Sequence, residues 1–227
     1  MPGTTIRSGM RLEVVGSPGQ RAADVIAEAL KERGRCALAL SGGRTPAPMF
    51  RRLAGNDVDW SNVDIYQVDE RVAPDGHADR NLELIRNELL DGIEGKQPRV
   101  HAMDVTADDL EEAAERYAAL LPEKLDIVHL GLGSDGHTAS LVPNDPVLDV
   151  RDRMVAITKP YDGYVRMTLT FPALEAAERI VFLEAGKEKA GAVRALVAGD
   201  PSMPAGRLRA RDVLVIADPD AAVSVAR

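Results

Sequence analysis

The strongest chemical signal in the chain is a glycine-rich segment at residues 131–140, Gly-Leu-Gly-Ser-Asp-Gly-His-Thr-Ala-Ser, which directly follows an apolar run. Within it, Asp135 can fix the orientation and tautomer of the His137 imidazole, which leaves the second ring nitrogen free as a general base near neutral pH. A serine-hydrolase elbow does not fit, because neither serine of the segment stands in a G-x-S-x-G pattern. The segment therefore predicts proton transfer by an Asp–His pair.

The same segment formally matches the dinucleotide-binding pattern G-x-G-x-x-G. That interpretation needs a long helix directly after the glycines and a second strand that ends in an acidic residue. Pro143 and Pro146 follow closely instead, and no such strand is clear in the sequence. A dinucleotide cofactor is therefore disfavoured.

A second candidate segment lies between the apolar run at residues 36–40 and a helix start at Thr45-Pro46. Glycine lets the backbone approach a ligand closely, and the free N–H groups of a helix start favour an anion such as a phosphate. An ordinary turn with a Thr-Pro cap would explain the same residues, and a nucleotide P-loop would not, since no Lys-Ser/Thr pair follows the glycines. In the anion interpretation, the segment of Ser41, Gly42, Gly43, Arg44 and Thr45 is a candidate phosphate-binding loop.

Charged residues gather in two further places. Asp69, Glu70 and Arg71 end a strand-like run, and they are either a solvated loop of paired charges or an acid that orients or protonates a substrate beside an anion-binding arginine. Lys187 and Lys189 stand in the first turn of an expected helix, where a cation opposes the helix dipole unless an anion lies nearby. Solvated lysines are the alternative interpretation.

The remaining histidines and the cysteine give no sign of a metal site. We expect His77 to be exposed in a polar loop, His101 to lack a partner, and His129 to be a satisfied core histidine. Cys36 is expected to be a small buried hydrophobe rather than a reactive thiol. Four scattered histidines and one cysteine do not have metal-site spacing, so no catalytic metal is predicted.

Composition restricts the classes of function. The 227 residues are 45% hydrophobic, which allows a sizeable core, and the formal net charge is −8. An acidic surface argues against a nucleic-acid or anionic-membrane partner, although a local basic pocket could still hold a small anion. No disulfide, signal peptide or membrane span is expected, so we predict a cytoplasmic protein without an obligatory protein partner.

Strand-like and helix-like patterns alternate along the chain. We expect strands at residues 11–15, 36–40, 63–68, 126–130, 166–170, 180–183 and 213–216. A Ser17–Gln20 capping box should begin the first helix, Gly34 should end it, and Thr106 should cap another helix. The alternation predicts one α/β domain over residues 1–227, with a three-layer, doubly wound, mostly parallel sheet and helices on both faces.

Together, these segments resemble the 6-phosphogluconolactonases, within the wider group that includes glucosamine-6-phosphate isomerase/deaminases. The resemblance covers almost the whole chain and rests on five motifs in order: Ser-Gly-Gly-x-Thr-Pro, Asp-Glu-Arg, Gly-x-Gly-x-Asp-Gly-His-Thr-Ala-Ser, Arg-x-Thr-Leu-Thr and Gly-x-x-Lys-Ala. Each motif is modest evidence alone, whereas all five in this order are highly specific.

The resemblance implies where a substrate would lie. The loop at residues 41–45 and Lys189, rather than Lys187, would contact a phosphate. The sugar end would be lined by Asp69, Arg71, Asp135, His137 and Arg166. The implied reaction is hydrolysis of 6-phospho-D-glucono-1,5-lactone to 6-phosphogluconate, a step of the pentose phosphate pathway that needs no cofactor. His137 would activate water, and Arg71, Arg166 and loop amides are candidates to stabilise the oxyanion.

Two departures separate the chain from the deaminases. Their Asp-Gly-His is followed by a segment ending Asn-Glu-Pro, whose glutamate takes part in ring opening, whereas the matching residues here are Leu141, Val142 and Pro143. Their Asp-Glu-Tyr is replaced by Asp-Glu-Arg. A non-catalytic sugar-phosphate sensor is a third possibility, but no DNA-binding domain is expected before the first strand. The oligomeric state, the sugar epimer, the share of phosphate contacts among Arg44, Lys187 and Lys189, and substrate contact by Asp135 stay open.

Overall fold

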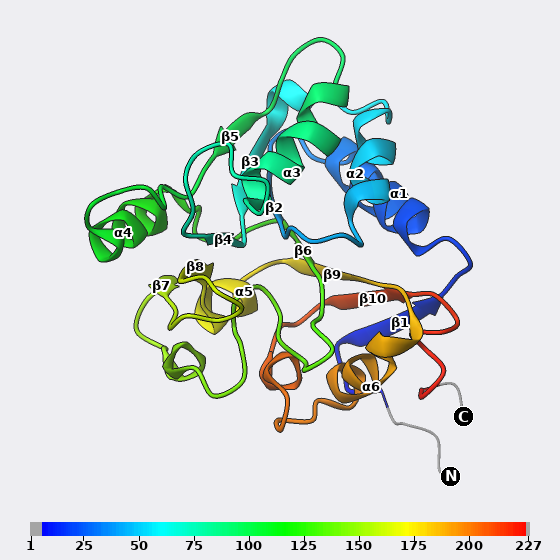
Figure 1. Ribbon diagram of the computed structural model, residues 1–227. Coiled ribbons are helices and arrows are strands. Elements are labelled where there is room, and N and C mark those ends of the chain that lie inside the picture. The colour runs from blue at the N-terminus through cyan, green and yellow to red at the C-terminus, as the bar shows by residue number, and fades with distance from the viewer. Residues whose placement is uncertain (1–5, 226–227) are drawn as a thin grey trace.

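The computed structural model describes residues 6–225 and contains two sheets (Figure 1). The larger sheet has seven parallel strands in the order β1-β10-β9-β6-β2-β3-β5. These strands are β1 (Met10–Val14), β2 (Cys36–Leu40), β3 (Val63–Gln67), β5 (Arg99–His101), β6 (Ile127–Leu130), β9 (Arg179–Glu184) and β10 (Val213–Ala217). The smaller, antiparallel sheet contains β4 (Asp69–Arg71), β8 (Arg166–Leu169) and β7 (Val155–Ile157).

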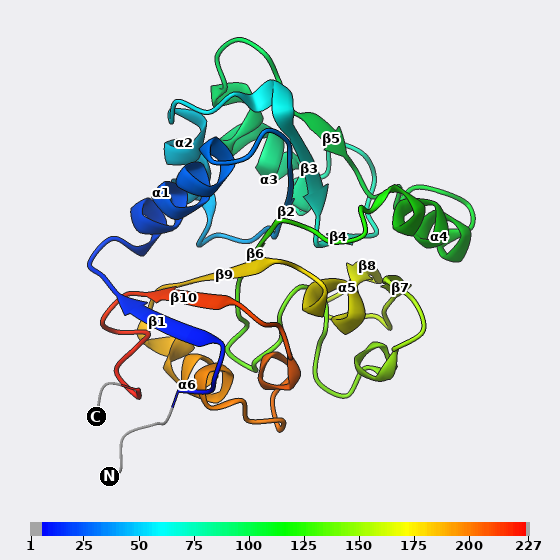
Figure 2. The same ribbon diagram turned by 180° about the vertical axis from the view of Figure 1, so that it is seen from behind.

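Helices cover both faces of the larger sheet. They are α1 (Pro18–Lys31), α2 (Ala47–Ala54), α3 (Asn81–Glu88), α4 (Leu110–Leu120), α5 (Phe171–Glu175) and α6 (Ala190–Ala198). Figure 1 and the reverse view in Figure 2 place α1, α2 and α3 on one side, and α5, α6 and the small sheet on the other. No helix within residues 6–225 is long and apolar enough to cross a membrane.

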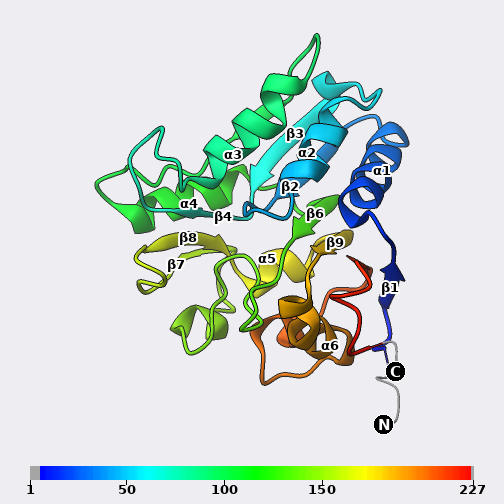
Figure 3. The same cartoon turned by 45° about the vertical axis from the view of Figure 1, so that its right-hand side comes forward.

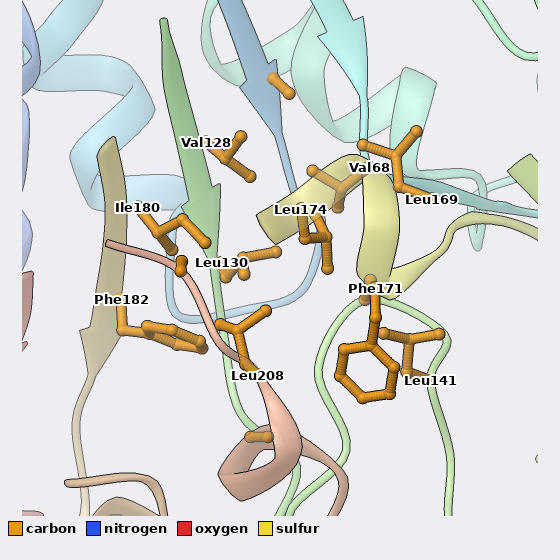
Figure 4. Packing of buried hydrophobic residues seen from close by; sticks show 14 of the residues in the cluster. Val68, Val128, Leu130, Leu141, Leu169, Phe171, Leu174, Ile180, Phe182 and Leu208 are labelled. Atoms are coloured by element: carbon orange, nitrogen blue, oxygen red, sulfur yellow. The ribbon is translucent and has the colours of Figure 1, made fainter. Parts of the chain in front are cut away.

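The sheet separates two hydrophobic cores, because successive side chains of a strand point to opposite faces. In β2, Leu38 and Leu40 pack with α1, α2 and α3, whereas Ala39 belongs to the core on the other face. Figure 4 shows part of this second core, in which Leu130 of β6 lies between Phe182 of β9 and Leu174 of α5. Strands buried on both faces read as continuous apolar runs, and the predicted three-layer, mostly parallel α/β fold is confirmed.

The small antiparallel sheet was not expected from the sequence. The predicted strand at residues 166–170 forms β8 of this sheet and does not join the parallel one. The run from residue 63 leaves the large sheet at Val68, whose N–H donates to the Leu40 carbonyl (3.1 Å) and whose carbonyl accepts from the Leu169 N–H (2.7 Å). Figure 3 shows the resulting β4 beside β8 and β7. Apolar periodicity reports burial and not the pairing partner, so this change of sheet had no sequence signal.

The predicted start of α1 is confirmed, since Ser17 is its N-cap and Pro18 its first residue, whereas the capping box, the end at Gly34 and the cap of α4 were wrong. Within the described chain, the Ser17 hydroxyl makes no capping hydrogen bond, so the capping box does not form, and α1 ends at Lys31, before Gly34. Asp109, not Thr106, caps α4, since its carboxylate accepts from the Glu112 N–H (3.0 Å). Carboxylates and hydroxyls cap almost equally well, so tertiary packing decides which residue is used.

The strand order places a binding site between β2 and β6. The chain adds β3 and β5 on one side of β2, and later adds β6 and β9 on its other side. The order therefore reverses between β2 and β6, and ligands of open α/β sheets bind at such a switch point, outside the carboxyl ends of the strands. The two glycine-rich segments at residues 41–45 and 131–140 leave the sheet at these two ends.

Candidate active site

A cleft of about 810 Å³ opens at the switch point. Of the predicted site residues, its lining includes Ser41, Gly42, Gly43, Arg44, Thr45, Asp69, Arg71, His137, Arg166 and Lys189. Asp135 is outside the lining, as is Lys187, which is exposed. The lining also contains Asn81, His129 and Glu184, which sequence reasoning did not assign to a site.

Asp135 and His137 form a hydrogen-bonded pair, with 2.7 Å between Asp135 Oδ1 and His137 Nδ1. Burial opposes ionisation of Asp135, but His137 and the Tyr161 hydroxyl outweigh it and lower the pKa of this carboxyl. An ionised Asp135 can only accept a hydrogen bond. The proton of the neutral imidazole therefore lies on Nδ1, and Nε2 keeps a free lone pair. Since His137 lines the cleft and Asp135 does not, the carboxylate lies behind the ring, in the place of an orienting group.

Gly133 is required by this pair. Its N–H donates to the His137 carbonyl (2.8 Å), which folds the loop back on itself. A Cβ on Gly133 would lie 2.1 Å from His137 Nδ1 and 2.4 Å from Asp135 Oδ1, closer than any side chain can tolerate. The loop therefore brings backbone into the space beside the imidazole, which only glycine permits.

In the Asp-Glu-Arg motif, the central residue supports the fold and the two outer residues line the cleft. Glu70 is fully buried and accepts from the backbone N–H groups of Asn81 (2.7 Å) and Leu82 (2.9 Å) at the start of α3. It also forms an ion pair with Arg80, with 3.2 Å between Oε2 and Nε. Glu70 thus fixes α3, which carries Asn81, while its two neighbours in the motif line the cleft.

Asp69 is held by two polar side chains. It accepts from the Ser140 hydroxyl (2.5 Å) and from the Asn81 amide (3.1 Å), and only 4% of it is exposed. Burial raises the pKa of Asp69, although Ser140 and Arg166 act in the opposite direction. Gly42 makes room for Asn81, because a Cβ there would lie 2.0 Å from Asn81 Oδ1. Burial therefore favours the protonated form of this carboxyl more than in an exposed aspartate.

The cations of the cleft lack carboxylate partners. Arg71 and Arg166 lie directly opposite each other in the β4–β8 pair, and like charges at such positions repel. Within residues 6–225, none of Arg44, Arg71, Arg166 and Lys189 forms an ion pair with an acidic side chain. Such a cluster in a chain of net charge −8 is suited to an anionic ligand.

Lys189 stands in the short 3₁₀ turn Lys187–Lys189 before α6, and its ammonium donates to the Leu132 carbonyl (2.6 Å). This bond ties the lysine to the loop that carries His137. Glu184 ends β9 nearby, with 1% of its surface exposed. Burial raises the pKa of Glu184 well above its ordinary value of 4.5, against the opposing effect of Lys189.

We expect the Glu184→Gln substitution to stabilise the protein more at pH 8 than at pH 5. The unfolded carboxyl releases its proton above its ordinary pKa of 4.5, whereas the folded one retains it, so stability falls as the pH rises from 4.5 toward the folded pKa. Glutamine removes this loss. Thermal melts of both proteins at the two pH values measure the effect, and an equal difference in Tm at both would contradict the assignment.

Two histidines differ from their predicted environments. His129 is buried, as expected, but within the described chain neither ring nitrogen has a hydrogen-bond partner, and burial lowers its pKa to about 3. His101 has a partner, because its Nε2 lies 2.9 Å from Asp64 Oδ1 and its ring stacks on Tyr66. His77 is exposed and Cys36 buried, as predicted. In residues 6–225, no group of three or more His, Cys, Asp or Glu could hold a metal ion.

Fold and cleft define a class: an α/β enzyme with a hydrogen-bonded Asp–His pair and a cluster of cations at the switch point of its sheet. Residues 12–216 match the family described as glucosamine-6-phosphate isomerases/6-phosphogluconolactonase. The chain belongs to this family.

Named relatives refine the comparison. A 6-phosphogluconolactonase from Synechocystis sp. is 37% identical over 174 residues, which is 72% of each chain. The crystal structure of 6-phosphogluconolactonase from Thermotoga maritima matches with a TM-score of 0.82 at 27% identity, over 93% of this chain and 100% of that one. A monomeric glucosamine-6-phosphate deaminase has a TM-score of 0.84 at 24% identity, over 94% and 98%. Proteins named as lactonase and as deaminase therefore share this fold.

Proposed function

We infer that the protein is a 6-phosphogluconolactonase, which hydrolyses 6-phospho-D-glucono-1,5-lactone to 6-phosphogluconate in the pentose phosphate pathway. The observation that carries this inference is the Asp–His pair beside a cleft whose cations, within residues 6–225, form no ion pair with a carboxylate. The similarity to curated 6-phosphogluconolactonases supports it. The deaminase glutamate is replaced at its matching position by Val142, which is buried and lies outside the cleft lining.

The reaction requires a base, an oxyanion site and a phosphate anchor. In our proposal, Nε2 of His137 takes a proton from water, and the resulting hydroxide attacks the C1 carbonyl of the lactone. The oxyanion is stabilised by Arg71, Arg166 and loop N–H groups. The tetrahedral intermediate collapses with cleavage of the bond between C1 and the ring oxygen, which takes the proton back from the imidazolium. Asp69 hydrogen-bonds a sugar hydroxyl, Asp135 orients the base, and no cofactor takes part.

The phosphate is assigned to the other end of the cleft. We place it between Lys189 and the loop of Ser41, Gly42, Gly43, Arg44 and Thr45. Anchoring a remote phosphate fixes C1 against the base and converts binding energy into orientation. Lys187 is exposed and outside the lining, which leaves Arg44 and Lys189 as the charged anchors. We also propose that the chain acts as a single domain in the cytoplasm, where one unpaired cysteine is stable.

We expect Lys189→Ala to raise KM about 10–100-fold with a smaller change in kcat. A charge-assisted hydrogen bond to a phosphate contributes about 1.5–3 kcal/mol, and it is made in both the ground state and the transition state. Steady-state hydrolysis kinetics measure both constants. Lys187→Ala is the matched control and should leave them within about twofold, as surface changes usually do. Equal KM values for the two variants would remove Lys189 from the phosphate site.

Lactone hydrolysis tests the function directly. A glucose-6-phosphate dehydrogenase reaction generates fresh 6-phosphoglucono-1,5-lactone at mildly acidic pH, and its disappearance is compared with the spontaneous rate. We expect acceleration in proportion to the protein, without added metal. A rate equal to the spontaneous one, from folded protein, would overturn the inference. Ammonia release from glucosamine 6-phosphate would then test the deaminase alternative.

A further inference from the structure

We propose that Tyr161 is a positioning residue for the catalytic base, holding the Asp135 carboxylate so that the Asp135–His137 pair stays aligned toward the cleft. The proposal rests on the proposed lactonase function and deepens it. Tyr161 lies in none of the five motifs that pointed to the site. It is also absent from the cleft lining, so it acts through its neighbours.

Contacts of Tyr161 reach both halves of the catalytic machinery. Its hydroxyl donates to Asp135 Oδ2 (2.9 Å), while His137 Nδ1 lies against the other oxygen, Oδ1 (2.7 Å). The Tyr161 ring meets the His137 ring edge to face, with 5.5 Å between centroids and 70° between planes. The Arg166 guanidinium lies over the Tyr161 ring at 5.2 Å from its centroid. One side chain therefore touches the orienting carboxylate, the base and a cation of the cleft.

A short hairpin fixes this side chain. Tyr161 and Tyr164 exchange backbone hydrogen bonds (2.8 and 3.2 Å), and Asp162 and Gly163 between them have φ of +50° and +81°. Positive φ at both central residues marks the type I′ turn, for which Asp-Gly is a favoured sequence. The turn leads directly into β8, which carries Arg166. Tyr161 is thus held by regular backbone and not by a free loop.

The two tyrosines of the hairpin anchor to different loops. The Tyr161 hydroxyl donates a hydrogen bond to Asp135 in the loop that carries His137, whereas the Tyr164 hydroxyl donates to the exposed Asp79 carboxylate (2.6 Å). Arg71 donates to the backbone carbonyl of Asp79 (2.7 Å) and not to its carboxylate within residues 6–225. The pair therefore offers two chemically equal hydroxyl-to-carboxylate bonds, of which only one involves the base.

Removing the Tyr161 hydroxyl should have two effects. The carboxylate loses the donor that holds Oδ2, so Asp135 and the ring it orients become less well aligned, and kcat falls. Without the Tyr161 donor, the negative charge of Asp135 is no longer shared with a hydroxyl. The carboxylate then attracts the imidazolium more strongly, which favours the protonated ring. The acid limb of the pH–rate profile should therefore move to higher pH. A side chain that served only folding would not shift this limb.

The experiment compares Tyr161→Phe, Tyr164→Phe and the wild-type chain. Phenylalanine keeps the ring that contacts His137 and Arg166 and removes only the hydroxyl. We expect Tyr161→Phe to lower kcat about tenfold with little change in KM, as for loss of a hydrogen bond to a charged group. Tyr164→Phe should leave kcat within about twofold. Imidazole NMR titration of His137 without substrate provides a readout independent of turnover, with its midpoint at higher pH in Tyr161→Phe alone.

The outcomes separate the two levels of inference. An inactive wild-type protein defeats the proposed function, while the titration still tests the contact with the base. An active wild type with unchanged kcat, pH profile and titration in Tyr161→Phe overturns the positioning role. Equal losses in both tyrosine variants would also overturn it, because they would show a general effect of the hairpin.

Discussion

Replacing His137 by alanine is expected to lower the rate of lactone hydrolysis by about 10²–10⁴-fold, the usual contribution of a general base. The imidazole lines the cleft while Asp135 holds its Nδ1. Without it, water must be activated by groups that only stabilise charge. Rates above the spontaneous background, measured on freshly generated lactone, give the effect, and KM should change little because the phosphate anchor remains.

His77→Ala is the matched control for this prediction. His77 is exposed in the loop before α3, lies outside the cleft lining and should leave the rate within about twofold. Urea unfolding of both variants shows whether a loss of rate reflects a loss of fold. A folded His137→Ala protein with wild-type turnover would end the assignment of His137 as the base.

The second large effect concerns stability: Glu70→Gln should lower the free energy of unfolding by about 3–5 kcal/mol. Glu70 is fully buried, pairs with the buried Arg80 and accepts from two backbone N–H groups of α3. Glutamine has nearly the same shape, but it carries no negative charge. Its NH₂ group would also face the backbone N–H groups of α3, which are themselves donors. Breaking one partner of a buried pair is strongly destabilising, and Arg80 would then depend on its ion pair with the exposed Asp75 (2.8 Å).

Urea unfolding by circular dichroism measures this change, with Glu83→Gln as its control. Glu83 is partly exposed and forms an i,i+3 pair with the exposed Arg86 on the same helix, and such pairs contribute about 0.2–0.5 kcal/mol. A loss below about 1 kcal/mol in Glu70→Gln would mean that Glu70 does not hold α3. Because α3 carries Asn81, which bonds both Asp69 and Arg71, we also expect the variant to hydrolyse lactone more slowly.

The antiparallel β4–β8 pair explains why the Asp-Glu-Arg motif has its particular order. Alternate residues of a strand face the same side, so Asp69 and Arg71 reach the cleft while Glu70 turns into the protein. The same pairing sets Arg71 opposite Arg166. Without a ligand, the cations of this cluster repel one another. A bound anion relieves the repulsion, so the cluster favours a phosphorylated ligand or an oxyanion.

The sequence by itself determined the layers of the fold and most of the candidate site. Continuous apolar runs such as Cys36–Leu40 require burial on both faces, and their alternation with amphipathic helices leaves few arrangements other than a covered parallel sheet. Parallel strands end at one edge, so the sequence placed the polar segments after β2 and β6 at the same edge of the sheet, while the strand order made them neighbours. The single domain over residues 1–227 and the catalytic roles stay predictions.

Only the tertiary structure decided which side chains complete the site. Tyr161, Asn81 and Ser140 touch Asp135 or Asp69 across many residues of sequence, and no local periodicity encodes such contacts. The exclusion of Lys187 from the cleft likewise depends on the turn before α6. Local patterns report burial and backbone preference, whereas hydrogen bonds between distant segments depend on how the strands pair. In this protein that pairing includes a small antiparallel sheet, which no sequence pattern predicted.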